Sequence, residues 1–528
     1  MGFGKFGGFS SFASGMDIEN IKQTLPLATG EVVKMGDVCE VVKGYARKTK
    51  RATNLQGTVF DTINRTMTGV VRAYKIDDTF SLIAYVVPAS AIEVLLVEHS
   101  ADGSIKTPLN TALSISLSTS RQHDMFIDKL ANGKYVLITN GLMSAFVLNV
   151  DLTTKAISMV ASKTAETGTN YGEGSMWIQK VSETSTVVKY AAFYGRDSNS
   201  GGLLQTIFTV DLSANVVTST TPATFDSSAK RGITGCRLSQ NRYLIVSSED
   251  LNVYWHVVDY NSVNDTFTVV GGKASISGTN PTGNTNGNWM QILNYAKNKF
   301  MILLSTYNNS TGQYYSRAIF AVYNETAKTL ALDSGAANDT AAPLTGYSGI
   351  DTNYSEPMRL IQVNYNTFVV AGAIATPTGS QKGTRVSVYR LHLKSDGVSP
   401  ELECVKYFDY TYTNAIAAVP DFVPFDLDKY HLFFGHSVTG ATNVKMVNIS
   451  VRGVSPVGVA THDATSGSIT IQLKGVLKGL NLVCGQKYMC NEFGDLSYIE
   501  GAHSIGTAIS SDSLLIPTII KAGIVPQD

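Results

Sequence analysis

The sequence predicts an all-β protein organised around a β-propeller of about seven blades. The first observation is a short unit that repeats seven times between about Gly69 and Val451. Each unit has an apolar–polar alternation, a polar turn, and an aromatic residue or valine that opens an apolar strand. These opening residues are 52 to 68 residues apart, which suits propeller blades with long loops. They are Phe80, Tyr135, Val187, Tyr243, Phe300, Phe368 and Tyr430.

The second observation is a further alternating strand after the opening residue, often followed by a polar turn and another strand. In the segment Ala145–Met159, alternation places Phe146, Leu148 and Val150 on one face, the period-two pattern of a half-buried strand. Turns such as Asp-Leu-Thr-Thr-Lys are typical of hairpins. Seven units predict seven blades, with six and eight as the alternatives.

The third observation is composition. Only 16% of the 528 residues are charged, while Gly, Ser, Thr, Asn and Tyr are abundant. This composition favours short strands joined by polar turns over long helices. Lys+Arg and Asp+Glu number 42 each, so net charge gives no argument for a nucleic-acid partner. No apolar run of 18 residues predicts a transmembrane helix, and no signal peptide pattern opens the chain.

The first sixteen residues form a tract of Gly, Ser and Phe that we expect to be disordered in isolation, because glycine costs entropy to order and offers no side chain to pack. Phenylalanine at every third position is unusual in a free tail. The tract is therefore predicted to be a docking peptide whose rings fill pockets on a partner, and a plain flexible terminus is the alternative. The docking residues are Phe3, Phe6, Phe9 and Phe12.

Residues 17–67 are predicted to form a small N-terminal β-module and a linker. Asp17–Gln23 could make two helical turns, with Asp17 as the cap. Two short strands, Glu31–Val33 and Val38–Val42, follow around a Met-Gly-Asp turn. The basic run Arg47, Lys48, Lys50 and Arg51 is interpreted as a solvated linker rather than a nucleic-acid site.

A change in composition after the repeats predicts a separate C-terminal β-domain at 456–528, with the propeller at 68–455. Its expected strands are Ser468–Lys474 and a closing pair, Ile505–Ala508 and Leu514–Ile516, with a hairpin through Gly494 and Asp495.

Both flanking segments resemble modules of bacteriophage structural proteins. Near the N-terminus, a Leu-Pro-Leu-Ala lead is followed by Gly-Glu-Val-Val and Gly-Asp-Val within Leu25–Gly44. The C-terminal segment is similar to the small β-domain of many phage tail, collar and fibre proteins over about 60 residues, although Cys484 and Cys490 depart from the usual pattern. Its motifs occur in the family's order at Gly458–Ala460, Val476–Leu480, Gly485–Met489, Gly494–Ser497 and Gly506–Leu515.

Motifs that carry chemistry are few. There is no sialidase box, nucleophile elbow, zinc-protease helix, phosphate-binding loop or EF-hand pattern. The five scattered cysteines fit small buried residues in a reducing cytosol, and no Cys-x-x-Cys pair predicts zinc. His431 and His436 fall on opposite faces of a strand, and the pair His462-Asp463 is interpreted as structural. We therefore expect no catalytic residue, cofactor or metal, although facing carboxylates of a glycosidase stay open.

Loops rich in Asn, Gly and Tyr are the predicted recognition surface, because propeller strands scaffold their loops and Tyr and Trp suit adaptable contacts. The candidate contacts with a glycan or protein are Trp289, Tyr314, Tyr315, Tyr407, Tyr410 and Tyr412. The alternative is that each is a solvent-exposed residue at the tip of a loop or a residue of a blade core.

The resemblance implies a non-enzymatic virion structural protein of tail, collar or fibre, made in the host cytoplasm and attached to the particle by its N-terminus. The propeller would serve assembly or host-receptor contact. Expected partners are other proteins of the tail, neck or baseplate and a host surface glycan or protein. A homo-oligomer, preferably a trimer, is expected because exposed β-edges are commonly buried by self-association. The alternative function is a glycan-binding or glycan-cleaving propeller that acts as a receptor-binding protein or depolymerase.

Overall fold

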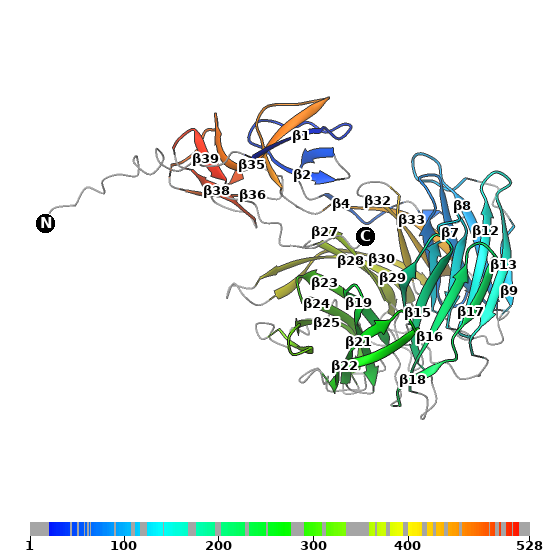
Figure 1. Ribbon diagram of the computed structural model, residues 1–528. Coiled ribbons are helices and arrows are strands. Elements are labelled where there is room, and N and C mark those ends of the chain that lie inside the picture. The colour runs from blue at the N-terminus through cyan, green and yellow to red at the C-terminus, as the bar shows by residue number, and fades with distance from the viewer. Residues whose placement is uncertain are drawn as a thin grey trace. The chain divides into compact units, whose positions relative to one another are not determined.

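The computed structural model confirms the all-β prediction, since every regular element of the described residues is a strand (Figure 1). The chain divides into two compact units: unit 1 is Met1–Ala52 with Arg452–Gly523, and unit 2 is Thr53–Val451 with Ile524–Asp528. The two flanking segments therefore share one unit instead of forming two modules. The structure describes residues 21–42, 45–49, 52–57, 59–60, 63, 65–88, 91–106, 111–116, 124–140, 142–166, 176–195, 202–227, 232–249, 252–275, 290–308, 313–333, 358–364, 367–375, 381–393, 400–413, 420–425, 429–437, 442–452, 457–484, 486–490, 496–497, 503–508 and 510–516.

Unit 2 contains seven successive antiparallel sheets of four or five strands. The first strands are β6 (Val71–Lys75), β10 (Met125–Lys129), β14 (Trp177–Glu183), β19 (Ile233–Ser239), β23 (Met290–Ala296), β27 (Met358–Asn364) and β31 (Asp421–Pro424). The second strands are β7 (Phe80–Val87), β11 (Tyr135–Thr139), β15 (Val187–Gly195), β20 (Arg242–Glu249), β24 (Lys299–Asn308), β28 (Thr367–Ala375) and β32 (Lys429–Ser437). Every opening residue of the sequence repeat is the first or second residue of a second strand, so the predicted phase is correct.

The outer half of each sheet is a hairpin of a third and a fourth strand. The third strands are β8 (Ala91–Glu98), β12 (Ser144–Asp151), β16 (Leu203–Asp211), β21 (Asn252–Asn261), β25 (Gln313–Asn324), β29 (Gln381–Leu393) and β33 (Thr442–Arg452). The first six sheets end in β9 (Leu113–Ser116), β13 (Ala156–Thr164), β17 (Val216–Ser219), β22 (Thr266–Ser275), β26 (Thr329–Leu332) and β30 (Pro400–Thr413), and β18 (Ala223–Asp226) also pairs with β16.

The seventh sheet takes its outer strands from the other end of unit 2. β33 pairs with β4 (Ala52–Asn54) and β5 (Val59–Phe60), which precede the first sheet in sequence. Both ends of the repeat region are thus joined by backbone hydrogen bonds in one sheet. Tyr410 of β30 strengthens this junction, because its hydroxyl donates to the Leu55 carbonyl and lies 3.4 Å from the Gly57 amide nitrogen.

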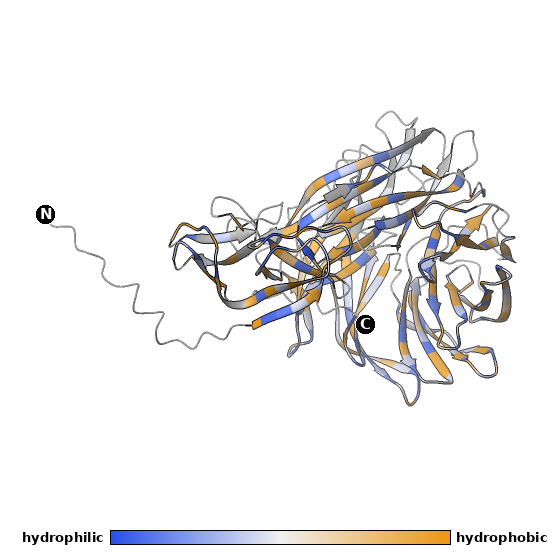
Figure 2. Ribbon diagram, turned by 90° about the horizontal axis from the view of Figure 1, so that it is seen from above, coloured by the Kyte–Doolittle hydropathy of each residue, from blue (hydrophilic) through white to orange (hydrophobic). Residues whose placement is uncertain are grey.

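Each sheet buries both faces, which differs from the half-buried strands predicted from alternation. In β12, Phe146 and Leu148 pack in a cluster shared with the preceding sheet, while Ala145 and Val147 pack in a cluster shared with the following one. Five of the seven inter-sheet clusters repeat this arrangement between later neighbours or close the series. Figure 2 shows the resulting mixture of apolar and polar residues along the strands.

The first and seventh sheets share the cluster that closes the series. It joins Ile83 and Tyr85 of β7 to Phe433 of β32 and Met446 of β33, all with essentially no exposed surface. Burial of an aromatic or large aliphatic side chain contributes about 1.5 to 3 kcal/mol. Among the described residues, each of the seven sheets therefore shares one apolar cluster with the preceding sheet and another with the following sheet, and the first and seventh sheets share one as well.

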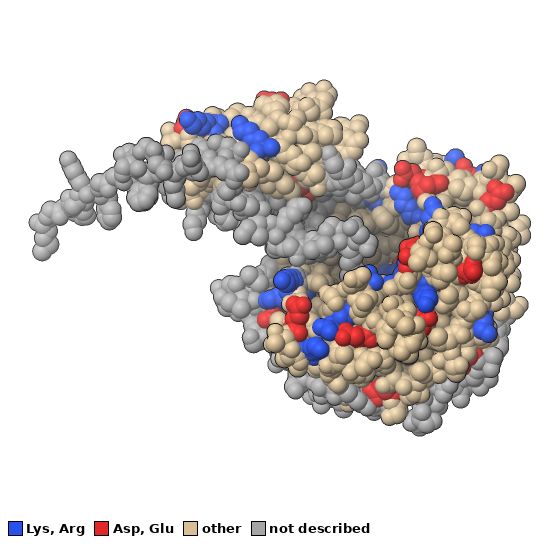
Figure 3. Space-filling view, in the orientation of Figure 1, with Lys and Arg blue, Asp and Glu red and all other residues tan. Residues whose placement is uncertain are grey.

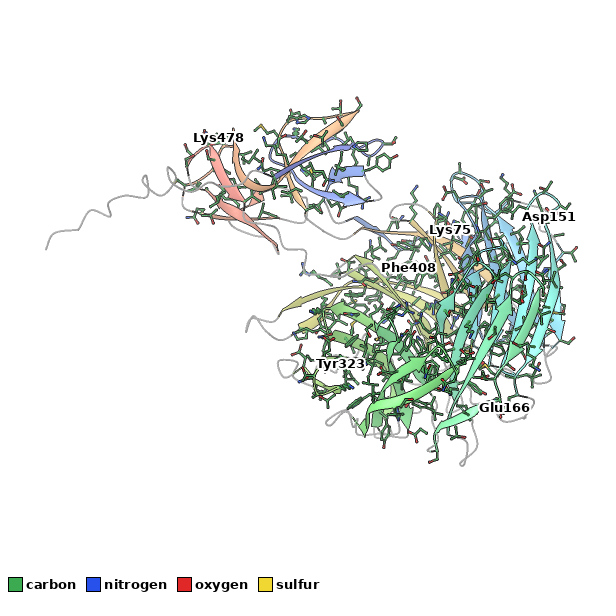
Figure 4. All side chains as sticks on the ribbon, in the orientation of Figure 1. Lys75, Asp151, Glu166, Tyr323, Phe408 and Lys478 are labelled. Atoms are coloured by element: carbon green, nitrogen blue, oxygen red, sulfur yellow. The ribbon has the colours of Figure 1, made fainter. Side chains whose placement is uncertain are left out.

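The outer hairpin turns repeat one local structure. In the β12–β13 turn, Asp151 Oδ1 accepts hydrogen bonds from the backbone amides of Thr153 and Thr154 (Figure 4). The turn then closes with Lys155 in the left-handed conformation, and its Nζ lies 2.5 Å from Glu98 Oε2 in the preceding sheet. Corresponding left-handed residues are Asn215, Asp265 and Lys328, each with φ 54°.

Replacing Lys328 with glycine is expected to raise the free energy of unfolding by about 0.5 to 1 kcal/mol, because left-handed backbone is strained for a residue with a Cβ atom. Ala327→Gly in the same turn is the matched control and should lower it by a similar amount, since Ala327 does not have positive φ. Urea unfolding followed by circular dichroism measures both. Equal destabilisation by the two variants would contradict the strain argument.

Unit 1 is one nine-stranded sheet that combines both ends of the chain. β35 (Ser468–Lys478) is its longest strand and pairs with β1 (Ile21–Pro26), β34 (Gly458–Ala460) and β39 (Ser513–Ile516). The predicted closing pair is confirmed, because β38 (His503–Ala508) pairs with β39. The remaining strands are β2 (Val38–Val42), β3 (Tyr45–Lys48), β36 (Lys487–Cys490) and β37 (Leu496–Ser497).

Three predictions for the N-terminal segment are wrong. Glu31–Val33 is not a strand, since only Val33 forms an isolated bridge, to Ala464. Ile21–Gln23 lies in strand β1 rather than a helix, because this stretch pairs with β35 and tertiary pairing overrides local helix propensity. The basic run is not a solvated linker at Arg47 and Lys48, which lie in β3. Arg47 is buried and its Nε lies 2.7 Å from Glu40 Oε1, while Lys48 Nζ lies 2.9 Å from Asp37 Oδ1.

Candidate ligand-binding cavity

The first strands of all seven sheets line one cavity of about 400 Å³. Each first strand contributes a residue at or next to its N-terminal end, so the cavity lies at one end of the ring of first strands. Four of the lining residues are charged: Arg72, Asp124, Arg359 and Asp421. The volume is within the range of small-molecule sites, about 300 to 1,000 Å³.

Asp421 links three sheets. Its Oδ2 accepts a hydrogen bond from the Ala73 backbone amide of the first sheet at 2.9 Å, and its Oδ1 accepts one from Arg359 Nε of the sixth sheet at 2.7 Å. The Phe422 amide also donates to Oδ1 at 3.0 Å. The Asp421 side chain is only 3% exposed, so these three donors replace the hydrogen bonds that the carboxylate would otherwise make to solvent. Such a carboxylate holds neighbouring sheets together through charge-assisted hydrogen bonds.

Asp124 has the same role between the first three sheets. Arg72 Nη2 of the first sheet donates to Asp124 Oδ1 at 2.5 Å, and the Met176 amide of the third sheet donates to Oδ2 at 3.2 Å. Arg72 also donates to the carbonyls of Met125 and Val71. Both side chains are below a tenth exposed. This pair therefore faces protein on most sides.

Two of the three remaining junctions use an amide and an indole. Gln291 Oε1 of β23 accepts a hydrogen bond from the Leu360 amide of β27. Trp177 of β14 lies flat against Gly235 of β19, where an added Cβ would come within 2.6 to 2.8 Å of the indole ring. Glycine at 235 is thus required for this close approach. Phe193 and Tyr243 pack on the same indole, with ring centroids 5.5 and 5.9 Å away.

The hydrogen-bonding groups of the cavity that remain available to a ligand are donors. The carboxylates of Asp124 and Asp421 already accept three hydrogen bonds each. Arg359 donates only through Nε among the described groups, and its side chain is 34% exposed, so both terminal amino groups are open. The amide nitrogen of Gln291 likewise has no hydrogen-bond partner in the described part of the chain. A ligand rich in acceptors would match this arrangement.

Of the candidate contacts predicted from the loops, only Tyr407 and Tyr410 have described side chains, and neither lines this cavity. Tyr407 is 53% exposed on β30, with the Arg385 guanidinium 4.4 Å above its ring. Tyr410 is a core residue, since it is 6% exposed and bonded to Leu55, so its prediction as a loop contact is wrong. Tyr314 and Tyr315 lie in β25 and Tyr412 in β30, so these too are strand positions rather than loops. Trp289 and the docking residues Phe3, Phe6, Phe9 and Phe12 lie outside the described residues.

Sequence reasoning missed the cavity residues, although a signal exists. Thr234, Gln291, Arg359 and Asp421 each lie nine residues before the opening residue of their repeat, and Arg72 lies eight residues before Phe80. Aligning the repeats on the opening residues brings four of these polar side chains to the same position and Arg72 to the next one. First strands of a repeat that surround a common axis then place equivalent positions at the same level.

A second polar cluster lies between the first and seventh sheets. His99 follows β8 and His431 lies in β32, with ring centroids 4.0 Å apart, and Phe425 stacks on His431 at 4.0 Å. Nδ1 of His99 and both ring nitrogens of His431 are buried without a hydrogen-bond partner of good geometry among the described groups. Burial lowers the pKa of His99 to about 4, and burial together with the neighbouring His99 lowers the pKa of His431 to about 2. Both imidazoles are therefore neutral at pH 7.

Cysteines and metal-binding groups offer no further site in the described ranges. Cys39, Cys236, Cys404 and Cys484 are free thiols, and burial raises the pKa of the Cys39 thiol to about 12. No group of three or more His, Cys, Asp or Glu side chains comes together in the part of the chain that the structure describes. No helix there is long and apolar enough to cross a membrane. Asp463 has a structural contact, as predicted, because its Oδ1 accepts a hydrogen bond from the Met35 amide.

No protein family and no curated protein matches the sequence. Solved structures match at low identity. A lectin from Burkholderia pseudomallei is 11% identical over 75% of this chain and 100% of its own, with a TM-score of 0.44. A protein of unknown function from Dyadobacter fermentans is 10% identical over 75% of this chain and 98% of its own, with a TM-score of 0.37. A Lactobacillus plantarum protein is 14% identical over 58% of this chain and 82% of its own, with a TM-score of 0.34. These similarities are too distant to carry a functional argument.

Proposed function

We propose that this chain is a non-enzymatic bacteriophage virion protein of the tail, collar or fibre. In this proposal unit 1 belongs to the attachment part, and unit 2 is a seven-bladed β-propeller that presents a binding face to a virion partner or to the host surface. The observation that carries the proposal is the pairing of the two segments with phage-like motifs. They are separated by the whole repeat region, yet Val38 pairs with Val459 and β1 pairs with β35.

This pairing makes the resemblance more specific than two short motif matches would be. A chance match in Leu25–Gly44 has no reason to lie beside a chance match in the C-terminal segment. Here the two contribute to one sheet and to common apolar clusters. One such cluster contains Val38, Val459 and Leu514, and another contains Cys39, Ala460 and Ile471. Unit 1 is thus one folded module into which the repeat region is inserted.

The seven-bladed assignment is supported by the seven four-stranded repeats, their closed series of apolar clusters and the common cavity of their first strands. Taking the outer strands of the last sheet from residues before the first one is a known way for a radial repeat to avoid free edges. The propeller would hold its loops and cavity in fixed positions for recognition.

Binding rather than catalysis is supported by the state of the cavity carboxylates. Asp124 and Asp421 are committed to arginine and backbone donors from neighbouring sheets. A general acid or nucleophile must instead be free to reach its substrate. Exposed Lys, Arg, Asp and Glu are interspersed over the face of unit 2 shown in Figure 3, which suits recognition by shape and hydrogen bonds more than by net charge.

The proposal is tested on purified phage particles. Mass spectrometry of gradient-purified virions should detect this chain, and antibodies against unit 2 should label one fixed position on particles in electron micrographs. Phages that carry a deletion of Gly2–Gly15 should lose the protein from their particles, whereas its thermal unfolding should be unchanged. A matched variant with the four phenylalanines replaced by serine separates loss of the rings from loss of chain length. Particles that lack the wild-type chain would refute the virion role.

A further inference from the structure

We propose that the central cavity of unit 2 binds the carboxylate of an acidic sugar, with Arg359 as the residue that holds it. The inference rests on the proposed function, because it names the ligand class of the binding face. It starts from the inventory of the cavity. Four charged side chains line it, but three of them are less than a tenth exposed and only Arg359 presents its charge.

The geometry of Arg359 suits a carboxylate. Its Nε is occupied by Asp421 Oδ1 at 2.7 Å, which fixes the plane and direction of the guanidinium. The two terminal amino groups are left as a fork with parallel N–H bonds, the arrangement that arginine uses for bidentate carboxylate binding. Asp421 is itself fixed by the Ala73 and Phe422 amides. The donor fork is therefore held in place before a ligand arrives, which lowers the entropy cost of binding.

Other lining groups suit the ring of a sugar. Gln291 is anchored through Oε1 to the Leu360 amide, so its amide nitrogen is positioned to donate to a ring or hydroxyl oxygen. Trp177 lines the cavity with an indole held against Gly235, so it offers an apolar wall to the ring of a sugar. The carboxylates of Asp124 and Asp421 already accept three hydrogen bonds each, so they offer few acceptor sites to a ligand. A ligand that needs many acceptors from the protein, such as an ammonium group, is disfavoured.

The size of the cavity limits the ligand to a terminal sugar or a short fragment. About 400 Å³ accommodates one or two sugar rings and excludes a folded protein surface. The cavity lies at one end of the ring of first strands, where the end of a glycan chain can enter it. We therefore infer recognition of the terminal acidic residue of a surface glycan. A peptide with a free C-terminal carboxylate has the same anionic group and is the competing ligand in the test.

The test uses the full-length protein and a local fluorescence signal. Trp255→Phe together with Trp289→Phe leaves Trp177 as the sole tryptophan, so a change in emission reports on the cavity. The probes are D-glucuronate, D-galacturonate and N-acetylneuraminate, each against a neutral counterpart (D-glucose, D-galactose and N-acetylmannosamine). At least one acidic sugar should give a saturable change at millimolar or lower concentration, with no change from its neutral counterpart. A tripeptide with a free carboxyl end and its amide form the competing pair.

Two variants locate the site. Arg359→Gln should weaken binding of the acidic sugar at least tenfold, and Arg359→Lys, which keeps the charge and loses the fork, should weaken it several-fold. Arg242→Gln is the matched control, because Arg242 pairs with Asp259 outside the cavity, and it should bind as the parent does. Thermal unfolding of each variant checks that it folds. If Arg359→Gln does not fold, Arg359→Lys alone tests the site.

The outcomes separate this inference from the virion role. Binding of no acidic sugar, equal binding of acidic and neutral sugars, or binding by Arg359→Gln with the parent's affinity each overturns the carboxylate site. Preference for the free-carboxyl tripeptide over every sugar also overturns it. Detection of the wild-type chain in purified virions is an independent measurement. If sugars fail to bind and the chain is in virions, the ligand assignment is wrong and the virion role stands.

Discussion

Acidification from pH 7 to pH 5 is expected to lower the free energy of unfolding by about 4 kcal/mol through His99 and His431 alone. Both imidazoles are buried between the first and seventh sheets, and their pKa values lie at about 4 and about 2. In the unfolded chain both return to about 6.5. Between pH 6.5 and 4 the unfolded state therefore binds protons that the folded state does not. Each histidine then contributes up to about 1.4 kcal/mol per pH unit.

The sign of this effect follows from lowered pKa values. A base that is neutral when folded and charged when unfolded stabilises the protein above pH 6.5, and the stability is lost as the pH falls. The surrounding charges only partly oppose this. Asp77 favours protonation of His99, while Lys75 disfavours protonation of both histidines and contacts the Phe425 carbonyl. Lys429 lies over the Phe425 ring, 5.9 Å from its centroid, and adds a further positive charge to this region (Figure 4 labels Lys75).

Two substitutions identify the source of the acid sensitivity. His431→Leu removes two buried nitrogens that lack a hydrogen-bond partner of good geometry among the described groups and keeps an apolar side chain against Phe425, so it should stabilise the protein at pH 7 by about 1 to 3 kcal/mol. His99→Gln retains a partner for Ser81 and removes a titrating group. Chemical unfolding at pH 7, 6 and 5 should show a shallower pH dependence for each variant and a nearly flat one for the double variant. An unchanged slope in the double variant would refute this assignment.

The repeat and its phase were predictable because the second strand of every sheet is buried on both sides. Such a strand must begin at a similar place in each repeat, and a run of apolar residues marks it. The same burial explains where the prediction of half-buried strands was wrong. Ala145 and Val147 in β12 look like the weaker face of an alternating strand, yet they pack against the next sheet. Alternation in sequence shows two faces but not what covers each face.

The aromatic candidates illustrate a different limit. The segment Tyr407–Thr413 contains three of the predicted loop contacts, because Tyr among Asn, Ser and Gly is typical of adaptable recognition surfaces. Its period-two alternation is in fact that of a strand: Tyr407 points outward, whereas Tyr410 is buried and bonded to Leu55. Local composition and periodicity conflicted, and periodicity was the better guide.

Long-range pairing accounts for most of what the sequence could not predict. The joining of β4 and β5 to β33, the common sheet of unit 1 and the proximity of His99 to His431 all connect residues hundreds of positions apart. Nothing in the local sequence of His99 distinguishes it from a surface histidine. The polar cavity residues could be predicted only in part. The phase of the repeat aligns them in the sequence, but only the arrangement of the sheets brings them together in space.

Asp421→Ala is expected to lower the free energy of unfolding by about 2 to 4 kcal/mol, because two backbone amides lose their acceptor and the partly exposed Arg359 loses its ion pair. Arg359 would lose the acceptor for its Nε, and the Ala73 and Phe422 amides would lose theirs. These groups belong to the first, sixth and seventh sheets, so one side chain supports three sheets at once. Asp421→Asn keeps one acceptor oxygen and should cost less than Asp421→Ala.

Asp259→Ala is the matched control for this prediction. Asp259 also forms a bidentate pair with an arginine, Arg242, but its side chain is 36% exposed and both residues lie in the same sheet. Removing it should cost no more than about 1 kcal/mol, as for other exposed ion pairs. Urea unfolding measures both variants, and hydrogen exchange should show lost protection at the Ala73 amide in Asp421→Ala alone. Similar losses in the two variants would mean that Asp421 is an ordinary surface partner and that the cavity is not held by its buried carboxylates.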